Sequence, residues 1–182
     1  MPSNPADAKG LLKAAIRDDN PVMFFLDIGL LYQPGEVPAG EHIVALGKAA
    51  VLREGSDVTL VSYGKTVHGC LAAAETLAAQ GIAAEVIDLL SLKPLDEAAI
   101  LASVTRTGRL VVVHEANRQC GIGAEIAALV AEKAFARLKT PIIRLGGPDA
   151  PVAASYPLEQ AFVPQAAAIA AAAAGLCQRQ AA

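Results

Sequence analysis

The sequence of 182 residues lacks tryptophan and has only four phenylalanines and three tyrosines. With so few aromatic rings, it offers little from which to build a base-stacking surface for single-stranded nucleic acid. It also lacks an excess of positive charge, since 15 Lys and Arg face 18 Asp and Glu for a net charge of −3. No group of Lys and Arg gathers on one predicted helical face, so we expect no nucleic-acid partner.

Cysteine is scarce as well, with Cys70, Cys120 and Cys177 widely spaced along the chain. An odd, scattered set indicates neither a disulfide framework nor a paired-cysteine zinc motif, and it favours a reducing cytoplasm. The most apolar tail, AAAIAAAAAGLC from Ala166, is short and mostly alanine, below the ~20 strongly apolar residues of a membrane span. The amino-terminal residues MPSNPADAKG lack the apolar core of a signal peptide. We therefore expect a cytoplasmic location and no membrane partner.

What the sequence does contain is apolar and regularly patterned. Hydrophobic residues make up 54% of the chain and charged residues 18%, which is typical of a folded globular protein. From residue 57 onward, apolar strand patterns alternate with helical ones, and Gly64, Gly81 and Gly108 mark the boundaries. The expected strands cover 58–63, 84–90, 110–113 and 141–147, and the expected helices cover 66–80, 96–107, 123–135 and a last segment after Pro164. This alternation predicts an α/β fold with a mostly parallel sheet and helices on both faces.

The first 56 residues follow another pattern. The spacing of apolar residues predicts a helix over 7–19, with Asp7 as its cap. An apolar strand is expected over 21–32. Residues 33–56 are rich in Pro and Gly, and we interpret them as a linker with a short hairpin near 42–50.

The most informative stretch is RLVVVHEANRQCGIGAEIAALVAEKAF, from Arg109 to Phe135. It predicts a buried strand, a polar turn that begins at His114 and Glu115, and a helix that starts after Gly121 and Gly123. The carboxyl end of a parallel strand is where open α/β sheets place ligands and partners. His114 and Glu115 are therefore candidate functional residues.

Two phosphate-binding motifs are excluded by single positions. Gly64-Lys65-Thr66 resembles the end of a P-loop, but the glycine that the motif needs five residues before the Gly-Lys pair is replaced by Thr59. Gly121-Ile122-Gly123 resembles the start of a dinucleotide fingerprint. Its third glycine would fall at Ile126, and Glu125 in the first helical turn would repel a pyrophosphate.

Catalytic and metal sites have equally little support. His114, Glu115 and Cys120 could act as a base, an orienting group and a nucleophile, but the spacing does not fix their contact, and a polar interface loop is the better interpretation. His68 and Cys70 lie two positions apart on a helix and point to different sides. There is no Gly-x-Ser-x-Gly elbow. We predict no catalytic, cofactor-binding or metal-binding residue in this chain.

Nine segments, taken together, resemble the carboxyl-terminal part of the beta subunit of thiamine-diphosphate-dependent 2-oxo acid dehydrogenases, the pyruvate, branched-chain 2-oxo acid and acetoin dehydrogenases. They occur in the family's order along nearly the whole chain: PSNPADAKGLLKAAIRDDNPV, LLY, LGKA, REGSDVTLVSYG, EVIDL, PLDE, TGRLVVVHEA, GIGAEIAALVAEKAF and GPDAPV.

The resemblance implies a three-layer α/β/α fold with a mostly parallel, five-stranded mixed sheet like the transketolase carboxyl-terminal domain. It implies three regions: residues 1–32 as the last helix and strand of the pyrimidine-binding domain, 33–56 as the linker and 57–182 as the carboxyl-terminal domain. The family's beta subunit is close to twice as long, and its amino-terminal half carries the carboxylate that activates thiamine and a catalytic histidine. Thiamine diphosphate and Mg are thus implied for the full enzyme, and neither is expected to bind this fragment.

The implied partners are a second beta subunit, the alpha subunit and the subunit-binding domain of the dihydrolipoyl acyltransferase. His114, Glu115, Arg118 and Gly121 fall on the loop at the carboxyl edge of the sheet, and we predict that they are interface residues. The parent would cleave its substrate beside a carbonyl and pass an acyl group to lipoamide, whereas the fragment alone would be inactive. Two alternatives remain, a stand-alone subunit-binding module and the tail of a transketolase or deoxyxylulose-phosphate synthase. The helix start at 65–68 and the segment GIGAEIAALVAEKAF argue against the second.

Overall fold

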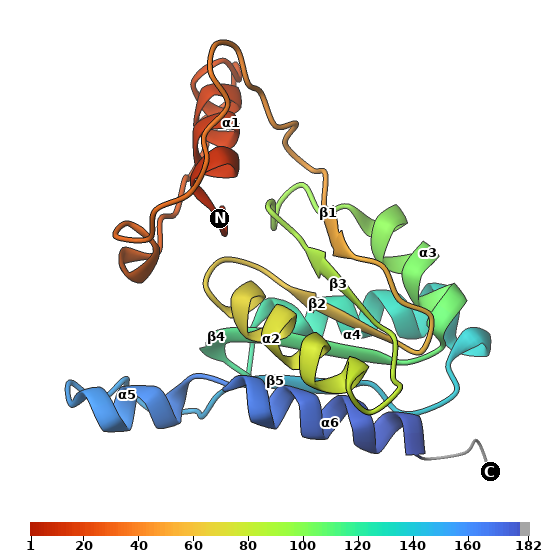
Figure 1. Cartoon of the computed structure of the whole chain (residues 1–182). Helices are drawn as coiled ribbons and strands as arrows, with labels where there is room; N and C mark the ends of the chain where they lie inside the picture. The colour runs from red at the N-terminus through yellow and green to blue at the C-terminus, as the bar shows by residue number, and fades with distance from the viewer. Residues whose placement is uncertain (179–182) are drawn as a thin grey trace.

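The computed structural model describes residues 1–178, and the last four residues of the predicted 57–182 domain lie outside this range. Its elements fall into an amino-terminal arm and a sheet domain (Figure 1). The arm, residues 1–46, holds α1 (Pro5–Ile16) and the short 3₁₀ turn η1 (Ile28–Leu30). The sheet domain holds β1 (Ala50–Arg53), β2 (Val58–Ser62), α2 (Thr66–Ala78), β3 (Ala84–Asp88), α3 (Glu97–Thr107), β4 (Leu110–Asn117), α4 (Ile122–Ala134), η2 (Phe135–Arg137), β5 (Ile143–Gly147), α5 (Tyr156–Phe162) and α6 (Ala166–Gln178).

Within the described residues the strands form one five-stranded sheet in the order β1-β3-β2-β4-β5. The pairs β3–β2, β2–β4 and β4–β5 are parallel, and only β1 is antiparallel to its neighbour. The predicted three-layer α/β fold with a mostly parallel mixed sheet is therefore confirmed. All five residues of β2 and all five of β3 are buried, because helices cover both of their faces.

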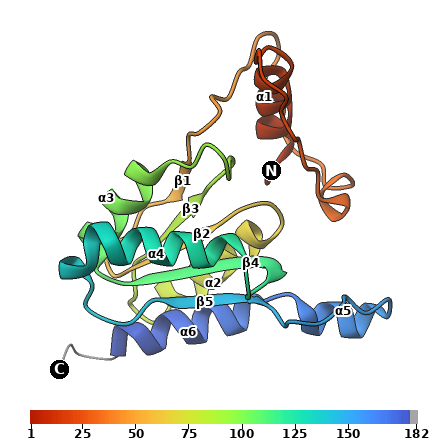
Figure 2. The ribbon, with the colours of Figure 1, turned by 180° about the vertical axis from the view of Figure 1, so that it is seen from behind.

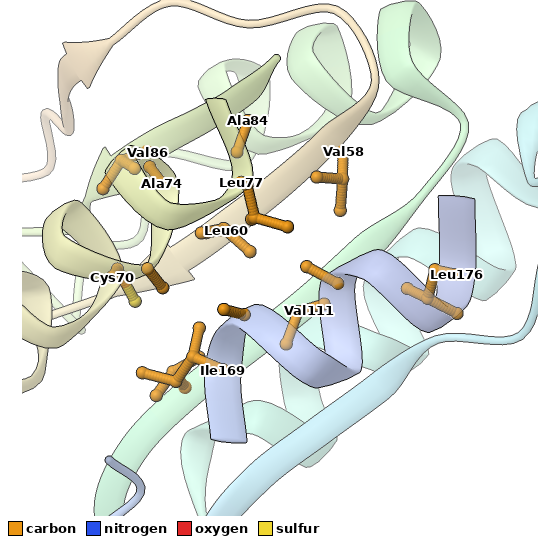
Figure 3. Close-up of a cluster of buried hydrophobic side chains, with 14 residues drawn as sticks. Val58, Leu60, Cys70, Ala74, Leu77, Ala84, Val86, Val111, Ile169 and Leu176 are labelled. Carbon is orange, nitrogen blue, oxygen red and sulfur yellow. The ribbon is translucent and has the colours of Figure 1, made fainter. Parts of the chain in front are cut away.

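The two faces of the sheet are covered by different helix pairs (Figures 1 and 2). On one face, α2 and α6 pack on side chains such as Leu60 and Val111, and Figure 3 shows Leu77 of α2 and Ile169 and Leu176 of α6 in this cluster. On the other face, α3 and α4 pack on residues of the same strands that point the opposite way, among them Val61, Ile87, Leu110 and Val112. The alternation along each strand thus divides the core into two layers.

The ends of α3 are set by residues that the sequence identifies. Asp96 caps the helix by accepting a hydrogen bond from the Ala99 N–H at 3.2 Å. Gly108 ends it in the left-handed region, at φ 72°, which is a conformation that glycine adopts without steric cost. At the start of α1, however, the cap is Asn4 and not Asp7, because the Asn4 side chain accepts from the Asp7 N–H at 2.9 Å. Asp7 instead lies in the first turn.

The predicted strand over 21–32 is wrong. This segment is irregular apart from η1, and its apolar side chains are largely exposed, with Met23 at 81% and Tyr32 at 86%. A strand needs a neighbour for its backbone N–H and C=O groups, and no described residue supplies one. The fifth strand is β1, within the predicted linker, and it pairs with β3 instead of forming the expected hairpin.

The segment Tyr156–Gln178 corrects a second expectation. It has 23 residues, and an 18-residue window within it has a mean hydropathy of 1.4, so it meets the length and composition of a membrane-spanning helix, which we did not expect of any segment. The regular structure is interrupted at 163–165, between α5 and α6. Helix α6 then packs Ile169, Ala173 and Leu176 into the core beside α2, so its apolar face takes part in the fold of this chain.

Candidate functional site at the carboxyl edge of the sheet

The order of the strands defines a position where the chain reverses its direction of winding. From β2 the chain passes through α2 to β3 on one side, and from β3 it passes through α3 to β4 on the other side of β2. The chain therefore leaves the carboxyl ends of the neighbouring strands β2 and β4 toward opposite sides. Such a position is called a switch point, and open α/β sheets leave a crevice for ligands there. Tyr63 follows β2 and His114 lies in β4, and their rings stack with centroids 6.3 Å apart.

A hollow of about 430 Å³ opens at this switch point. Its polar side chains are Tyr63, Glu115, Asn117 and Glu159, and its apolar side chains are Met1, Val152, Phe162 and Val163. We refer to it as the switch-point crevice. Strands β2 and β4 supply its floor, and the residues from 152 to 163 close one side.

Glu115 is the most perturbed carboxyl group of the crevice. Burial raises its pKa, the negative charges of Asp27 and Glu159 raise it further, and Lys65 opposes them. The pKa of Tyr63 is also raised, first by burial and then by the charge of Glu115. The crevice thus holds a phenol that keeps its proton and a carboxyl group that gives up its proton less readily than an exposed glutamate.

His114 is completely buried, at 0% exposure, and its side chain lies under the surface of the crevice. Its Nδ1 donates to the Ala116 carbonyl oxygen at 2.9 Å, which leaves Nε2 as the unprotonated nitrogen of the neutral ring. Three glycines enclose the ring. A Cβ added at Gly121, Gly123 or Gly146 would lie 2.7 to 2.8 Å from a ring atom. Glycine is therefore required at these positions because the ring fills the space.

The environment of His114 keeps it uncharged. Burial lowers its pKa, the positive charge of Arg144 lowers it further, and the hydrogen bond to Ala116 opposes both. Nε2 has no hydrogen-bond partner among the described residues and lies against Gly123 at the start of α4. The positive end of the α4 dipole disfavours a positive charge on the imidazole ring. The neutral ring of His114 packs between β4, β5 and α4.

The structure separates the four residues predicted at an interface. His114 is buried within the chain, where its ring packs between β4 and α4, and its interface role likewise remains a prediction. Gly121 lies directly on the His114 ring as the residue before α4, Glu115 faces the crevice, and Arg118 is exposed beyond the end of β4. Interface roles for Glu115, Arg118 and Gly121 remain predictions.

The structure does not support Cys120 as a nucleophile activated by His114. Cys120 is exposed in the turn before α4, at φ 56°, whereas the His114 ring is buried with Nδ1 bonded to a carbonyl. No hydrogen bond joins the two side chains in the part of the chain that the structure describes. Strand β4 also continues to Asn117, so His114 and Glu115 lie within the strand and not in the predicted turn.

One residue of this edge was missed in the sequence. Asp88 ends β3 with its carboxyl group fully buried, and Oδ1 accepts from the Leu90 N–H at 3.1 Å while Oδ2 has no partner among residues 1–178. Burial raises its pKa to about 6. The arm reaches this point as well, because His68 Nε2 donates to the Ser3 carbonyl oxygen at 2.8 Å. The signal was an aspartate directly after the buried run EVI, the usual position of a functional carboxylate.

The described residues do not fit Mg–thiamine diphosphate. No group of three His, Cys, Asp or Glu side chains that could hold a metal ion is found among residues 1–178. Burial raises the pKa of Glu115, which lines the crevice, whereas a metal ligand must be deprotonated. The described part of the chain thus offers no set of ligands for the magnesium of this cofactor.

Comparison with known proteins places the fold in a family. Residues 47–169 match the family model "Transketolase, C-terminal domain". The chain is 51% identical over 164 residues to the beta subunit of acetoin:2,6-dichlorophenolindophenol oxidoreductase of Bacillus subtilis. The aligned region covers 90% of this chain and 48% of that relative. It is 48% identical over 151 residues to the beta subunit of the pyruvate dehydrogenase E1 component of the same organism, covering 82% and 46%.

A solved structure agrees with these matches. The chain is similar to one described as "Split gene transketolase, inactive beta4 tetramer", with a TM-score of 0.78 and 27% identity over 98% of this chain and 56% of that one. The chain spans about half the length of the curated relatives that it matches.

Proposed function

The chain belongs to the transketolase C-terminal domain family, and from this premise we propose that it is the assembly region of the beta subunit of a thiamine-dependent 2-oxo acid or acetoin dehydrogenase. The parent enzyme would use thiamine diphosphate and Mg to cleave its substrate beside a carbonyl and transfer an acyl group to lipoamide. The cofactor supplies the electron sink in such chemistry. This chain would supply surfaces that hold subunits together.

The proposal rests on the sequence similarity of the chain to dehydrogenase beta subunits, taken together with the burial of its sheet-edge histidine. Identity of 46–51% to beta subunits of acetoin, pyruvate and 2-oxoisovalerate dehydrogenases extends over most of the chain. Yet His114, the histidine at the sheet edge, is buried and neutral, and its ring has no exposed atom that could contact a substrate. A region that shares the fold of these subunits but keeps its sheet-edge histidine away from solvent suits a structural role.

The arm gives this proposal a specific surface. Apolar side chains of residues 12–32 that a folded protein normally covers are exposed, among them Ile16, Met23, Phe25, Ile28 and Tyr32. A contiguous exposed apolar surface marks an interaction site. We propose that the other half of a beta subunit, a second beta subunit and the alpha subunit cover this region, with the acyltransferase docking on the sheet domain. The three free cysteines fit the proposed cytoplasmic location.

The experiment compares the chain alone with the chain in an assembly. Acetoin- and pyruvate-dependent reduction of a dye is measured for the purified chain, and we expect no turnover above the buffer. Gel filtration with a purified alpha subunit and acyltransferase subunit-binding domain then tests assembly. Turnover by the chain alone would reject the proposal, as would a monomer that binds neither protein.

The role of the sheet edge is tested in a full-length beta subunit. We expect Glu115→Ala with Arg118→Ala to weaken assembly, while His114→Ala should act through lower stability. Unchanged assembly and activity in the double variant would reject the interface role. A transketolase or synthase tail is disfavoured because the closer relatives are dehydrogenase subunits, at 46–51% identity against 27% for the split transketolase.

A further inference from the structure

Two arginines come together at the open edge of the sheet, outside the switch-point crevice. Arg144 lies in β5, the edge strand, and Arg118 lies in the turn that follows β4. Arg144 Nη1 donates to the Arg118 carbonyl oxygen at 3.1 Å, and the Arg118 N–H donates to the Gly147 carbonyl oxygen at 2.9 Å. These two hydrogen bonds fix the arginine-bearing turn on β5.

The arginines line a hollow of about 650 Å³. Its walls are β5, the turn after β4 and the junction between α5 and α6, where Phe162 and Val163 also border the switch-point crevice. Gln165 is held in the wall, because its Nε2 donates to the carbonyl oxygens of Gln160 at 2.8 Å and Val163 at 2.9 Å. The junction is thus tied together around the hollow.

The charges of this hollow are not balanced. Within residues 1–178 neither Arg118 nor Arg144 forms an ion pair, whereas Arg17 pairs with Glu41 and Arg106 with Glu85. Asp149 also lines the hollow, and its Oδ1 accepts from the neutral Asn117 Nδ2 at 3.4 Å, so one carboxylate stands against two guanidinium groups. Two like charges facing one space repel each other, and a bound anion removes this repulsion.

We propose that this hollow binds the phosphoryl group of a small metabolite, with Arg118 and Arg144 as its direct ligands. A guanidinium presents N–H donors as a planar fork that fits phosphate oxygens. A phosphoryl group carries a charge of about −1.5 to −2 and three acceptor oxygens, which matches two such forks. A carboxylate carries one charge and two oxygens, so it can accept the paired N–H donors of only one of the two guanidinium groups. The site rests on the hollow and its two arginines, and it shares only Arg118 with the interface proposed above.

The test is calorimetric titration of the whole purified chain with pyrophosphate at constant ionic strength. We expect saturable binding, and at least about a tenfold loss of affinity in Arg118→Gln and in Arg144→Gln, because each variant loses the charged hydrogen bonds of one guanidinium. Arg144→Lys, which keeps the charge and loses the fork, should fall between. Arg137→Gln is the matched control, since Arg137 is exposed in η2 and does not line the hollow, and its affinity should equal that of the wild type.

Circular dichroism of each variant verifies the fold. Equal affinity of the wild type, Arg118→Gln and Arg144→Gln would overturn the proposal, as would the absence of saturation below about 10 mM ligand. Malonate supplies two carboxylates in place of phosphoryl groups. Tighter binding of malonate than of pyrophosphate would overturn the assignment to a phosphoryl group.

Discussion

The sheet domain and the amino-terminal arm use the same kinds of apolar residue with opposite outcomes. In β2, Val58, Leu60 and Val61 are all at 0% exposure, whereas Met23 and Tyr32 of the arm are above 80%. Both segments are rich in apolar residues in the sequence, although residues 21–32 also contain Asp27 and Gly29. The difference is that β2 has strands on both sides and helices on both faces, while residues 21–32 have neither.

This contrast shows where each region obtains its stability. The sheet domain buries its own core. The arm is held together mainly by local contacts, since Gly10 of α1 packs closely on Val44, and Lys13 and Arg17 both pair with Glu41. Apolar surface left uncovered in this way is typical of a region that folds against a partner. Four predictions test the contrast.

The largest effect is expected where a core side chain is removed. Ile169→Ala should lower the free energy of unfolding by about 4 kcal/mol, because Ile169 is fully buried between α6 and α2 and its loss leaves a cavity (Figure 3). Ile16→Ala in α1, which is 75% exposed, should change it by less than about 0.5 kcal/mol. Urea denaturation measures both, and equal effects would show that the arm shares the core.

The second prediction concerns two glycines. A Cβ at Gly55 would lie 2.3 Å from the Ala84 carbonyl carbon and 2.4 Å from the Glu85 nitrogen, so backbone has to move in Gly55→Ala. We expect a loss of about 3 kcal/mol. The same substitution at Gly175 in α6, where nothing lies within 4 Å, should stabilise by up to about 1 kcal/mol. A neutral Gly55→Ala, measured by the same denaturation, would contradict the packing of β3 on residue 55.

The third prediction is a pH dependence. The buried Asp88 has its pKa raised to about 6, so the folded state holds this proton more tightly than the unfolded state. Its contribution to stability is therefore greatest below pH ~4 and is lost as the pH rises through about 6, by an amount on the order of 2 kcal/mol. Asp88→Asn, which cannot ionise, should flatten this part of the stability profile. A wild-type profile that rises over the same interval because of Asp88 would contradict the assignment.

The smallest effect is expected in the arm. Hydrogen bonds from Lys13 and Arg17 lower the pKa of Glu41 to about 2, but Glu41 is exposed and water screens the pairs. Glu41→Gln should leave the thermal midpoint of the chain within experimental error. A clear decrease would mean that the arm contributes to the cooperative fold.

The parts of the structure that depend on local pattern could be predicted from the sequence. The β/α alternation after residue 57, the Asp96 cap and the left-handed Gly108 all follow from neighbouring residues. Parts that depend on distant partners could not. Strand β1 exists because β3 accepts it as a neighbour, and β4 extends to Asn117 because β5 continues alongside it.

The candidate site shows the same limit. Its position at the carboxyl end of β4 follows from the sequence, but the burial of His114 depends on Gly121 and Gly123 at the start of α4 and on Gly146 in β5. The charge imbalance at Arg118 and Arg144 depends likewise on the packing of β5 beside the turn after β4. No pattern within one segment contains this information.

We proposed above that this chain is the scaffold portion of a thiamine enzyme and does not by itself hold the cofactor. Calorimetric titration of the purified chain with thiamine diphosphate and Mg²⁺ measures this binding. We expect no saturable binding by the chain alone. Stoichiometric, magnesium-dependent binding would overturn the proposal.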